Sequence, residues 1–272
     1  MLCAANGGNN NTAACVTPTQ ALAINKIWYG MTSDGSVPDP AVDNGTGALT
    51  GAHKWYGLMR GTSLLGLASP VPFDIAAHQV ALELQNSSIA VPSFKNATGN
   101  GQDGWKSLSY AQLSEAFDRG VALQPQFSFI DTDNPDLSAF KARGGKLIHT
   151  VGGADTHIPT GGSVNYYERV LAQMGGVSAV QPFYRFFFVP GWGHGSFANG
   201  SSNATANPPL LAKGQIYSLL TNWVEKGVAP DTFQVTSRSS SPVAKSLPLC
   251  VYPKKITYVN GDLFQAASYT CQ

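Results

Sequence analysis

The apolar positions in the second half of the chain predict two buried strands joined by helices. Residues 146–153 (KLIHTVGG) and 183–191 (FYRFFFVPG) are short, nearly continuous apolar runs that end at glycine. Such runs are typical of strands covered on both faces, as in a parallel sheet. Residues 161–176 and 208–227 instead repeat their apolar side chains with helical spacing. Strand, helix, strand, helix in this order predicts an α/β fold built on parallel strands.

Residue types at helix ends define a further short helix at the start of this half. In residues 134–145 (NPDLSAFKARGG), Asn134 can cap the helix, Pro135 suits its first position and Gly144 can end it. The residues of the two longer helices that we expect to face inward are Val164, Tyr167, Leu171 and Met174 in one and Ile216, Leu219, Leu220, Trp223 and Val224 in the other.

Residues 1–130 have a different pattern, rich in glycine, proline and asparagine and with only short apolar repeats. Helices are expected within 72–84 and 109–123. Residues 30–51 contain turn signals throughout and predict a long surface excursion. Because the pattern changes near residue 131, we expect two domains, 1–130 and 131–272.

One more helix is expected near the start, over residues 17–30. Either Thr17 or Thr19 can serve as its N-cap. The residues expected to face inward are Leu22, Ile24 and Ile27.

Composition narrows the class of partner. The chain has 17 Lys and Arg against 16 Asp and Glu, a formal net charge of +1, so no field favours nucleic acid or anionic lipid. Charged residues make up 12%, about half the usual share of roughly 25%. No apolar run approaches the roughly 20 residues of a membrane span. Neither nucleic acid nor a membrane is therefore expected as a partner.

The four cysteines lie in two close pairs, one at each end of the chain. Neither pair has the C-x-x-C spacing or the nearby histidines of a metal site, so we expect no metal ligands and no cofactor here. Two local disulfides, Cys3–Cys15 and Cys250–Cys271, are the favoured interpretation, and four separate buried thiols are the alternative. Disulfides would indicate an oxidising compartment, so the protein is expected to be secreted or periplasmic.

The glycosylation sequon N-x-[ST] recurs along the chain, and either secretion or chance in asparagine-rich loops explains it. The first residues, MLCAANGG, have neither the basic nor the long apolar region of a signal peptide. We therefore expect that the printed chain lacks its natural start. The sequon asparagines are Asn10, Asn44, Asn86, Asn96, Asn199 and Asn203.

Two residues with catalytic chemistry follow the predicted strands. Asp155 comes after the first strand in GGAD, and His194 follows the second in PGWGH. Functional groups gather beyond the carboxyl ends of parallel strands, so we expect the two side chains to meet. A carboxylate that orients a histidine makes it an effective general base. The alternative is that His194 is an ordinary loop residue.

A hydrolase with this acid and base also needs a nucleophile, which should precede Asp155 on a G-x-S-x-G turn. The sequence contains no such motif. The nearest segment, GTSLLG, lacks the spacing, so Ser63 is interpreted as a loop or helix-start serine. His149 within the first strand is expected to be structural, and His157 to lie at the surface or at a pocket rim.

The motifs around these residues resemble those of the tannase and feruloyl esterase family of α/β-hydrolases. The segments that carry the resemblance are NPDLSAFKARGGKL, GGADTHIP, YYERV, VPGWGH and the C-terminal LCVYPKKITYVNGD with Cys271. Upstream, CVTPTQALAINKIWYG and WYGLMRGTSLLGLASPVPFDIA are similar to the family's large lid. The resemblance spans nearly the whole chain. It implies a partial α/β-hydrolase fold, with 1–130 as part of the lid and 131–272 as the C-terminal part of the catalytic domain.

The resemblance also implies roles for individual residues. Asp155 would be the acid of a Ser-His-Asp triad and His194 its base. Ile158, three residues after the aspartate, would line the acyl side of the substrate pocket. Trp55 and Arg60 in the lid are candidates for contacts with an aromatic ring or a carboxylate, with packing inside the lid as the favoured alternative.

Some parts that the family would supply are absent from the sequence. The nucleophile segment and an acidic loop that binds a structural calcium would both lie upstream of Cys3. The family usually has a cysteine directly after the catalytic histidine, disulfide-linked to one beside the serine, and here that residue is Gly195. Either packing alone positions His194, or activity has been lost.

The expected function is hydrolysis of aromatic carboxylic esters, such as feruloyl or galloyl esters, by a serine esterase whose serine lies upstream. The 272-residue chain alone is expected to be inactive. The alternative is a secreted binding protein that keeps the fold and the pocket but not turnover.

Overall fold

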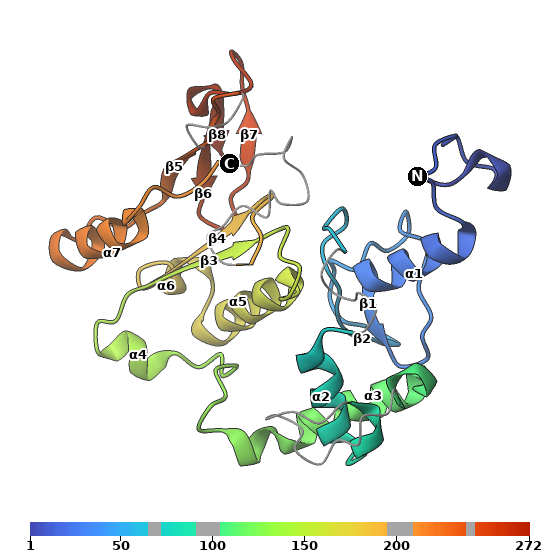
Figure 1. Cartoon of the computed structure of the whole chain (residues 1–272). Coiled ribbons are helices and arrows are strands. Elements are labelled where there is room, and N and C mark those ends of the chain that lie inside the picture. The colour runs from blue at the N-terminus through green and yellow to red at the C-terminus, as the bar shows by residue number, and fades with distance from the viewer. Residues whose placement is uncertain (65–71, 91–103, 195–208, 238–242) are drawn as a thin grey trace. The chain divides into compact units, whose positions relative to one another are not determined.

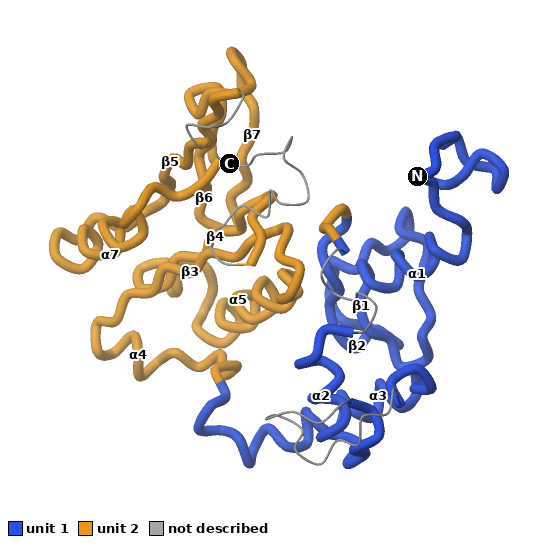
Figure 2. Tube along the Cα trace, viewed as in Figure 1, with its two compact units in different colours: residues 1–60, 64–131 blue, residues 61–63, 132–272 orange. Residues whose placement is uncertain are grey.

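The computed structural model (Figure 1) falls into two compact units, which Figure 2 distinguishes by colour. One unit comprises residues 1–60 and 64–131, and the other comprises residues 61–63 and 132–272. Their roles as lid and catalytic domain stay a prediction. The residues that the structure describes are 1–64, 72–90, 104–194, 209–237 and 243–272.

The first unit combines short strands with helices. Strands β1 and β2 pair antiparallel, and the turn-rich segment predicted for residues 30–51 connects them almost entirely without regular structure. Its elements are α1 (Pro18–Tyr29), β1 (Gly30–Thr32), β2 (His53–Tyr56), α2 (Asp74–Glu83) and α3 (Tyr110–Leu123), with 3₁₀ turns at Ala4–Asn6, Ser87–Ile89, Gly104–Ser107 and Gln124–Phe127.

Helix α1 is capped by Thr17, which decides between the two predicted caps. The Gln20 backbone N–H donates to Thr17 Oγ1 at 3.3 Å, and the Thr17 N–H donates to Gln20 Oε1 at 2.9 Å. This reciprocal pair is a capping box. Gly30 ends the helix with a φ of 115°, which few other residues adopt.

The inward face of α1 differs from the prediction. Leu22 is 50% exposed and Ile27 is 41% exposed, so both were wrongly placed in the core. The most buried residue of the helix is Tyr29, which is 6% exposed, and Ile24 is partly buried as predicted. The other partly buried residues of the helix are Ala21, Asn25, Lys26 and Trp28.

One apolar cluster of this unit is formed by α2 and by the segments around the 3₁₀ turns at Ser87–Ile89 and Gly104–Ser107. Its fully buried members are Ala81, Ile89 and Ala90. Around them pack larger but partly exposed residues, including Trp105 and Leu108. Apart from this cluster, the unit buries Tyr29, Tyr56 and Leu58.

The second unit contains the predicted parallel strand pair. Strands β3 and β4 pair in parallel, in register from Leu147 opposite Tyr184 to Gly152 opposite Val189. The pairs β5–β6 and β7–β8 are antiparallel, so the unit is a mixed α/β structure. Its elements are α4 (Ser138–Ala142), β3 (Leu147–Gly152), α5 (Thr160–Met174), α6 (Val177–Val180), β4 (Tyr184–Val189), α7 (Gln215–Lys226), β5 (Thr232–Thr236), β6 (Ser246–Cys250), β7 (Ile256–Tyr258) and β8 (Tyr269–Cys271), with a 3₁₀ turn at Ala266–Ser268.

Strand β4 is apolar apart from Arg185, because it is buried on both faces. Tyr184 and Phe186 pack into the cluster that contains Tyr167 and Leu171 of α5. The alternate residues Phe187 and Val189 belong to a second cluster, which contains residues of β5 and β6. Complete burial of a large apolar side chain contributes about 1.5–3 kcal/mol. This strand therefore joins the two cores of the unit.

Helix α4 begins later than the sequence predicted. The side chain of Asn134 accepts from the Asp136 N–H, and the side chain of Asp136 accepts from the Ser138 N–H, both at 2.9 Å. These two successive Asx turns compete with helix formation, so the helix starts at Ser138 rather than at Pro135. Gly144, with a φ of 74°, lies just after the helix as predicted.

Helix α7 also begins later than expected, at Gln215 after Gly214. Trp223 is buried, and Ile216 and Leu219 pack against the second cluster as predicted. Val224 is 62% exposed, so its predicted burial was wrong. It is rotated by about 100° from Trp223 around the helix axis, which takes it out of the buried face.

Both predicted disulfides are present, which excludes four separate thiols. Cys3 is bonded to Cys15, and Cys250 is bonded to Cys271, so the second bridge joins β6 to β8. Disulfides persist in oxidising compartments. In the described part of the chain, no helix has the length and apolar character needed to cross a membrane.

Candidate active site

The loops that follow β3 and β4 are held directly against each other. The Gly153 N–H donates to the Val189 carbonyl at 2.8 Å, and the Ala154 N–H donates to the Trp192 carbonyl at 2.6 Å. A Cβ atom at Gly152 would lie 2.4 Å from the Trp192 carbonyl oxygen, so only glycine allows this approach. The glycine that ended the predicted strand thus brings the two loops together.

These loops bring Asp155 and His194 within hydrogen-bonding distance, as expected for residues after adjacent parallel strands. His194 Nδ1 lies 3.2 Å from Asp155 Oδ2. The Asp155 side chain is 8% exposed, whereas that of His194 is 58% exposed. The pair therefore has a buried carboxylate and an imidazole that solvent or a substrate can reach.

Backbone donors fix the orientation of the Asp155 carboxylate. Its Oδ1 atom accepts hydrogen bonds from the backbone N–H groups of His157 at 2.8 Å and Ile158 at 2.9 Å. The other oxygen, Oδ2, is the one that faces His194. With the proton on Nδ1 directed to this oxygen, Nε2 is the His194 nitrogen that can exchange a proton with a reacting group. The arrangement can perform general acid–base chemistry.

The predicted substrate-binding residues lie in different places. Ile158 is in the Asp155 loop, and its side chain is 49% exposed. Trp55 is in β2 of the other unit, where its ring lies near those of Tyr56 and Phe117, at centroid distances of 5.7 and 6.3 Å. These contacts favour packing for Trp55. The proposed contact of each residue with substrate stays a prediction.

Arg60, also in the first unit, has partners of its own. Its guanidinium donates to the Asn25 side chain and lies 5.9 Å from the centre of the Trp28 ring. Its Nε atom is buried and has no hydrogen-bond partner among the residues that the structure describes. The predicted contact with a substrate carboxylate is untested.

His157 is exposed, in agreement with its predicted place at the surface or at a pocket rim, but its closeness to His194 was not predicted. The ring centroid of His157 lies 5.0 Å from that of His194. Its Nδ1 atom is 3.0 Å from the Thr156 hydroxyl. Asp155 and His157 form a D-x-H segment and therefore lie in the same loop. This spacing is the feature of the sequence that could have placed His157 near the acid–base pair.

His149 is partly buried in β3, where it contacts a core residue. Its Nδ1 atom is 2.8 Å from the Tyr184 hydroxyl, and the two rings are stacked. Burial lowers the pKa of His149, and burial also raises the pKa of Tyr184. The contact between His149 and Tyr184 therefore links the paired strands β3 and β4.

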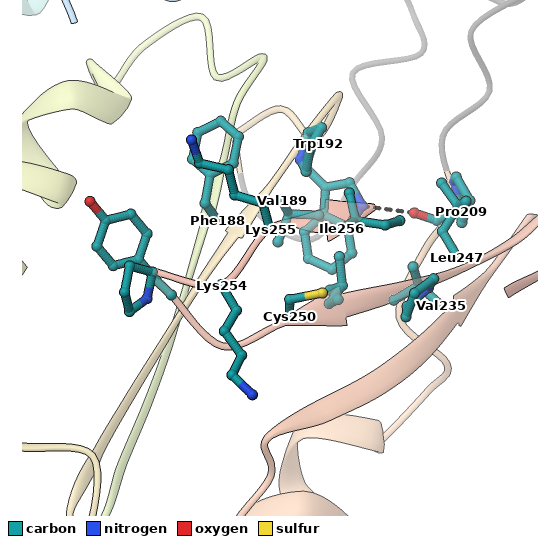
Figure 3. Close-up of a pocket in the computed structure, with 15 residues that line it drawn as sticks. Phe188, Val189, Trp192, Pro209, Val235, Leu247, Cys250, Lys254, Lys255 and Ile256 are labelled. Carbon is teal, nitrogen blue, oxygen red and sulfur yellow. Dashed lines mark hydrogen bonds between the residues drawn. The ribbon is translucent and has the colours of Figure 1, made fainter. Parts of the chain in front are cut away.

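An apolar cavity of about 420 Å³ lies beside the carboxyl end of β4 (Figure 3). Phe188, Val189 and Trp192 line it together with residues of β6. The Trp192 indole donates to the Pro209 carbonyl at 2.7 Å, which fixes the ring at the cavity (Figure 3). Neither Asp155 nor His194 lines this cavity, so it is separate from the acid–base pair.

Some predictions concern residues outside the described part of the chain. Gly195 belongs to this group, as do the sequon asparagines Asn96, Asn199 and Asn203. The described sequon asparagines accept hydrogen bonds from their sequon hydroxyl groups, Asn10 from Thr12 at 2.8 Å, Asn44 from Thr46 at 2.7 Å and Asn86 from Ser88 at 2.7 Å. Whether any of them carries a glycan stays a prediction.

The structural calcium implied by the family resemblance was expected upstream of this chain and stays a prediction. Calcium takes six to eight oxygen ligands. Among the described residues, the group of His, Cys, Asp and Glu side chains close enough to hold an ion is Asp155, His157 and His194. With two imidazoles and one carboxylate, this group does not suit calcium, so no chemical step is derived through that ion.

Two esterases are similar to this chain in sequence. A probable feruloyl esterase of Arthroderma benhamiae is 34% identical over 168 residues, which are 61% of this chain and 29% of the relative. A mono(2-hydroxyethyl) terephthalate hydrolase of Piscinibacter sakaiensis is 27% identical over an alignment of 290 positions, which covers 96% of this chain and 42% of the relative. The chain thus spans less than half of either relative.

A solved structure and a family model match the chain throughout. The crystal structure of feruloyl esterase B from Aspergillus oryzae covers 100% of this chain and 49% of its own, with 23% identity and a TM-score of 0.65. That likeness shows a shared fold over about half of the esterase. The model of the family described as tannase and feruloyl esterase matches residues 1–272. The chain therefore belongs to the tannase and feruloyl esterase family.

Proposed function

We propose that this chain supplies the acid and the base of a serine esterase that cleaves aromatic carboxylic esters. The observation that carries the proposal is the 3.2 Å contact between His194 Nδ1 and Asp155 Oδ2, beyond the ends of two adjacent parallel strands. In an α/β-hydrolase the triad runs Ser, Asp, His along the chain, and the order of these two residues agrees with it. Residues 131–272 would then be the C-terminal part of the catalytic domain, and 1–130 part of its lid.

His194 would act first as a base and then as an acid. It takes the proton from a serine hydroxyl, whose oxygen forms a bond to the ester carbonyl carbon. The tetrahedral intermediate collapses when the C–O bond to the alcohol breaks and His194 gives its proton to the leaving oxygen. Water repeats the sequence on the acyl-enzyme and releases the acid, which restores the serine.

Asp155 would position His194 and stabilise the charge that forms on it. Its carboxylate is held by two backbone N–H groups, so it keeps the imidazole in one tautomer and one orientation. The serine and the oxyanion donors would come from residues outside this chain. For this reason we expect the 272-residue chain alone to be inactive.

The substrate class is proposed by analogy with the relatives. The relatives include a probable feruloyl esterase and a mono(2-hydroxyethyl) terephthalate hydrolase, and both names refer to esters of aromatic acids. Ile158 is half exposed three residues after Asp155, and it would contact such a ring. The two disulfides support a secreted protein.

The proposal is tested on the complete gene product that contains these residues. Methyl ferulate and methyl gallate should be hydrolysed faster than a methyl ester of an aliphatic acid. His194→Ala should lower kcat by about 10⁴-fold or more, because the serine loses its base. Lys213→Ala is a matched control from the same unit and should retain full activity.

Two results would overturn the proposal. A complete gene product without turnover of any of these esters would favour the alternative, a binding protein that kept the fold. Turnover that persists in His194→Ala would remove this histidine from the mechanism. Hydrolysis of methyl ferulate by the 272-residue chain alone would show that the nucleophile lies within it.

A further inference from the structure

Asp155, His157 and His194 form a compact group of three donor side chains in the second unit. One ligand atom from each residue can be chosen so that all three lie within 4.8 Å of one another. The Asp155 carboxylate is buried, whereas both imidazoles are exposed. The group is not visible as a sequence motif, because His194 is 39 residues away from Asp155.

The donor set suits a zinc-like cation. Two imidazole nitrogens and one carboxylate oxygen form the three-ligand type of zinc site, in which water takes the fourth position. Zinc bonds of about 2.0–2.2 Å place neighbouring donor atoms roughly 3.3 Å apart. The side chains must therefore approach by up to about 1.5 Å, and rotation of the two exposed imidazoles can provide this.

Hydrogen bonds to neighbouring groups orient two of the three proposed ligands, Asp155 and His157. Asp155 Oδ1 accepts from the backbone N–H groups of His157 and Ile158, which fixes the carboxylate. The Thr156 hydroxyl lies 3.0 Å from His157 Nδ1. Metal-binding histidines are typically held through their second ring nitrogen in this way, and metal-binding carboxylates are themselves hydrogen-bonded.

We propose that Asp155, His157 and His194 bind one zinc-class divalent cation, and that this cation blocks the acid–base pair. A metal ion on His194 and Asp155 competes with the proton that the imidazole must take up and with the hydrogen bond between the two residues. The blocking effect rests on the proposed esterase function, whereas the binding itself does not. His157 is the third ligand of the proposed site and takes no part in the acid–base pair, so its substitution tests metal binding separately from the pair.

Binding is measured without substrate, so it does not depend on activity. Zn²⁺ is titrated into the complete gene product in competition with a chromophoric chelator, and Co²⁺ is titrated separately while its d–d absorption is recorded. We expect one equivalent to bind. His157→Gln should weaken binding at least about tenfold, since loss of even an outer partner of a ligand typically costs 10–100-fold. Asp262→Asn, an exposed carboxylate outside the group, is the control and should bind as the wild type does.

Inhibition is the second readout. Zn²⁺ should inhibit ester hydrolysis with the same half-saturation as in the direct titration, and His157→Gln should need at least about tenfold more zinc. Absence of binding, or equal binding by His157→Gln and wild type, would overturn the proposal. Tight binding that leaves the hydrolysis rate unchanged would overturn the blocking effect. If zinc binds but no ester is hydrolysed, the metal site stands and the esterase function fails.

Discussion

In the unit that contains β3 and β4, clusters of completely buried aromatic side chains fill the core, whereas the unit that contains α2 and α3 buries fewer large side chains, among them Tyr29 and Tyr56. Tyr184 and Phe186 are 0% exposed, and they pack against α5. In the other unit the buried cluster consists of Ala81, Ile89 and Ala90. The difference lies in how much apolar area each unit removes from water, and hence in what stabilises it.

The two units therefore depend on different interactions. The first relies on local contacts, such as the capping boxes of α1 and α3 and the Cys3–Cys15 bridge. The second relies on packing between segments distant in the sequence, and this packing also fixes the loops that carry Asp155 and His194. A rigid scaffold under two loops is what an acid–base pair requires.

Truncation of the aromatic core should have the largest effect on stability. Phe186→Ala should lower the free energy of unfolding by about 3–5 kcal/mol, because it removes a completely buried ring and leaves a cavity. Denaturant unfolding gives the loss, and hydrogen exchange locates it. Amides of β3 and β4 should lose protection while those of α3 keep it. Equal loss of protection in both units would contradict the inference that the two units depend on different interactions.

The pH dependence of stability should come partly from His149. Burial lowers its pKa in the folded state below the ordinary value of 6.5, so the unfolded state binds more protons as the pH falls through that value. Stability should therefore be complete above about pH 6.5 and decrease below it, by at most about 1.4 kcal/mol per pH unit for one group. His149→Gln should flatten this slope between pH 5 and 6.5. An unchanged slope would refute the assignment.

Removal of a helix cap should have a smaller effect, confined to the first unit. Thr17→Ala and Ser109→Ala each remove the side-chain oxygen of a capping box. Each should cost about 1 kcal/mol of unfolding free energy, measured by denaturant titration. Thr17→Ser keeps the oxygen and is the matched control. A loss as large as that of Phe186→Ala would mean that α1 holds more of the core than its exposure indicates.

Substitution of the misplaced apolar residues of α1 should have the smallest effect. Leu22→Ala should change the unfolding free energy by no more than about 0.5 kcal/mol, because its side chain is 50% exposed. Val224→Ala in α7 offers the same comparison in the second unit. A loss above about 2 kcal/mol for either variant, again by denaturant titration, would show that another surface covers it.

The sequence predicted the second unit well because its signals are strong. Continuous apolar runs that end at glycine identified β3 and β4, and the parallel pairing followed from the helix between them. The contact between Asp155 and His194 was predicted for the same reason. Both disulfides followed from the positions of the cysteines.

The errors have local physical causes. Asn134 was expected to cap a helix, but Asx turns use its side chain and delay the start of α4. Helical spacing identified α1 and α7 but did not fix their rotation, so Leu22 and Val224 were placed inward. The contact of His157 with His194 was not predicted, because the two residues approach only through the pairing of β3 with β4. Contacts of this kind depend on tertiary structure and leave little trace in the local pattern.

A double-mutant cycle on the complete gene product tests the central claim most directly. The kcat for methyl ferulate is measured in the wild type, in Asp155→Asn, in His194→Ala and in the double variant. If Asp155 acts only through His194, the double variant should be no slower than His194→Ala, and each single variant should lose about 10⁴-fold or more. Losses that multiply in the double variant, or a single variant that keeps its rate, would contradict the account.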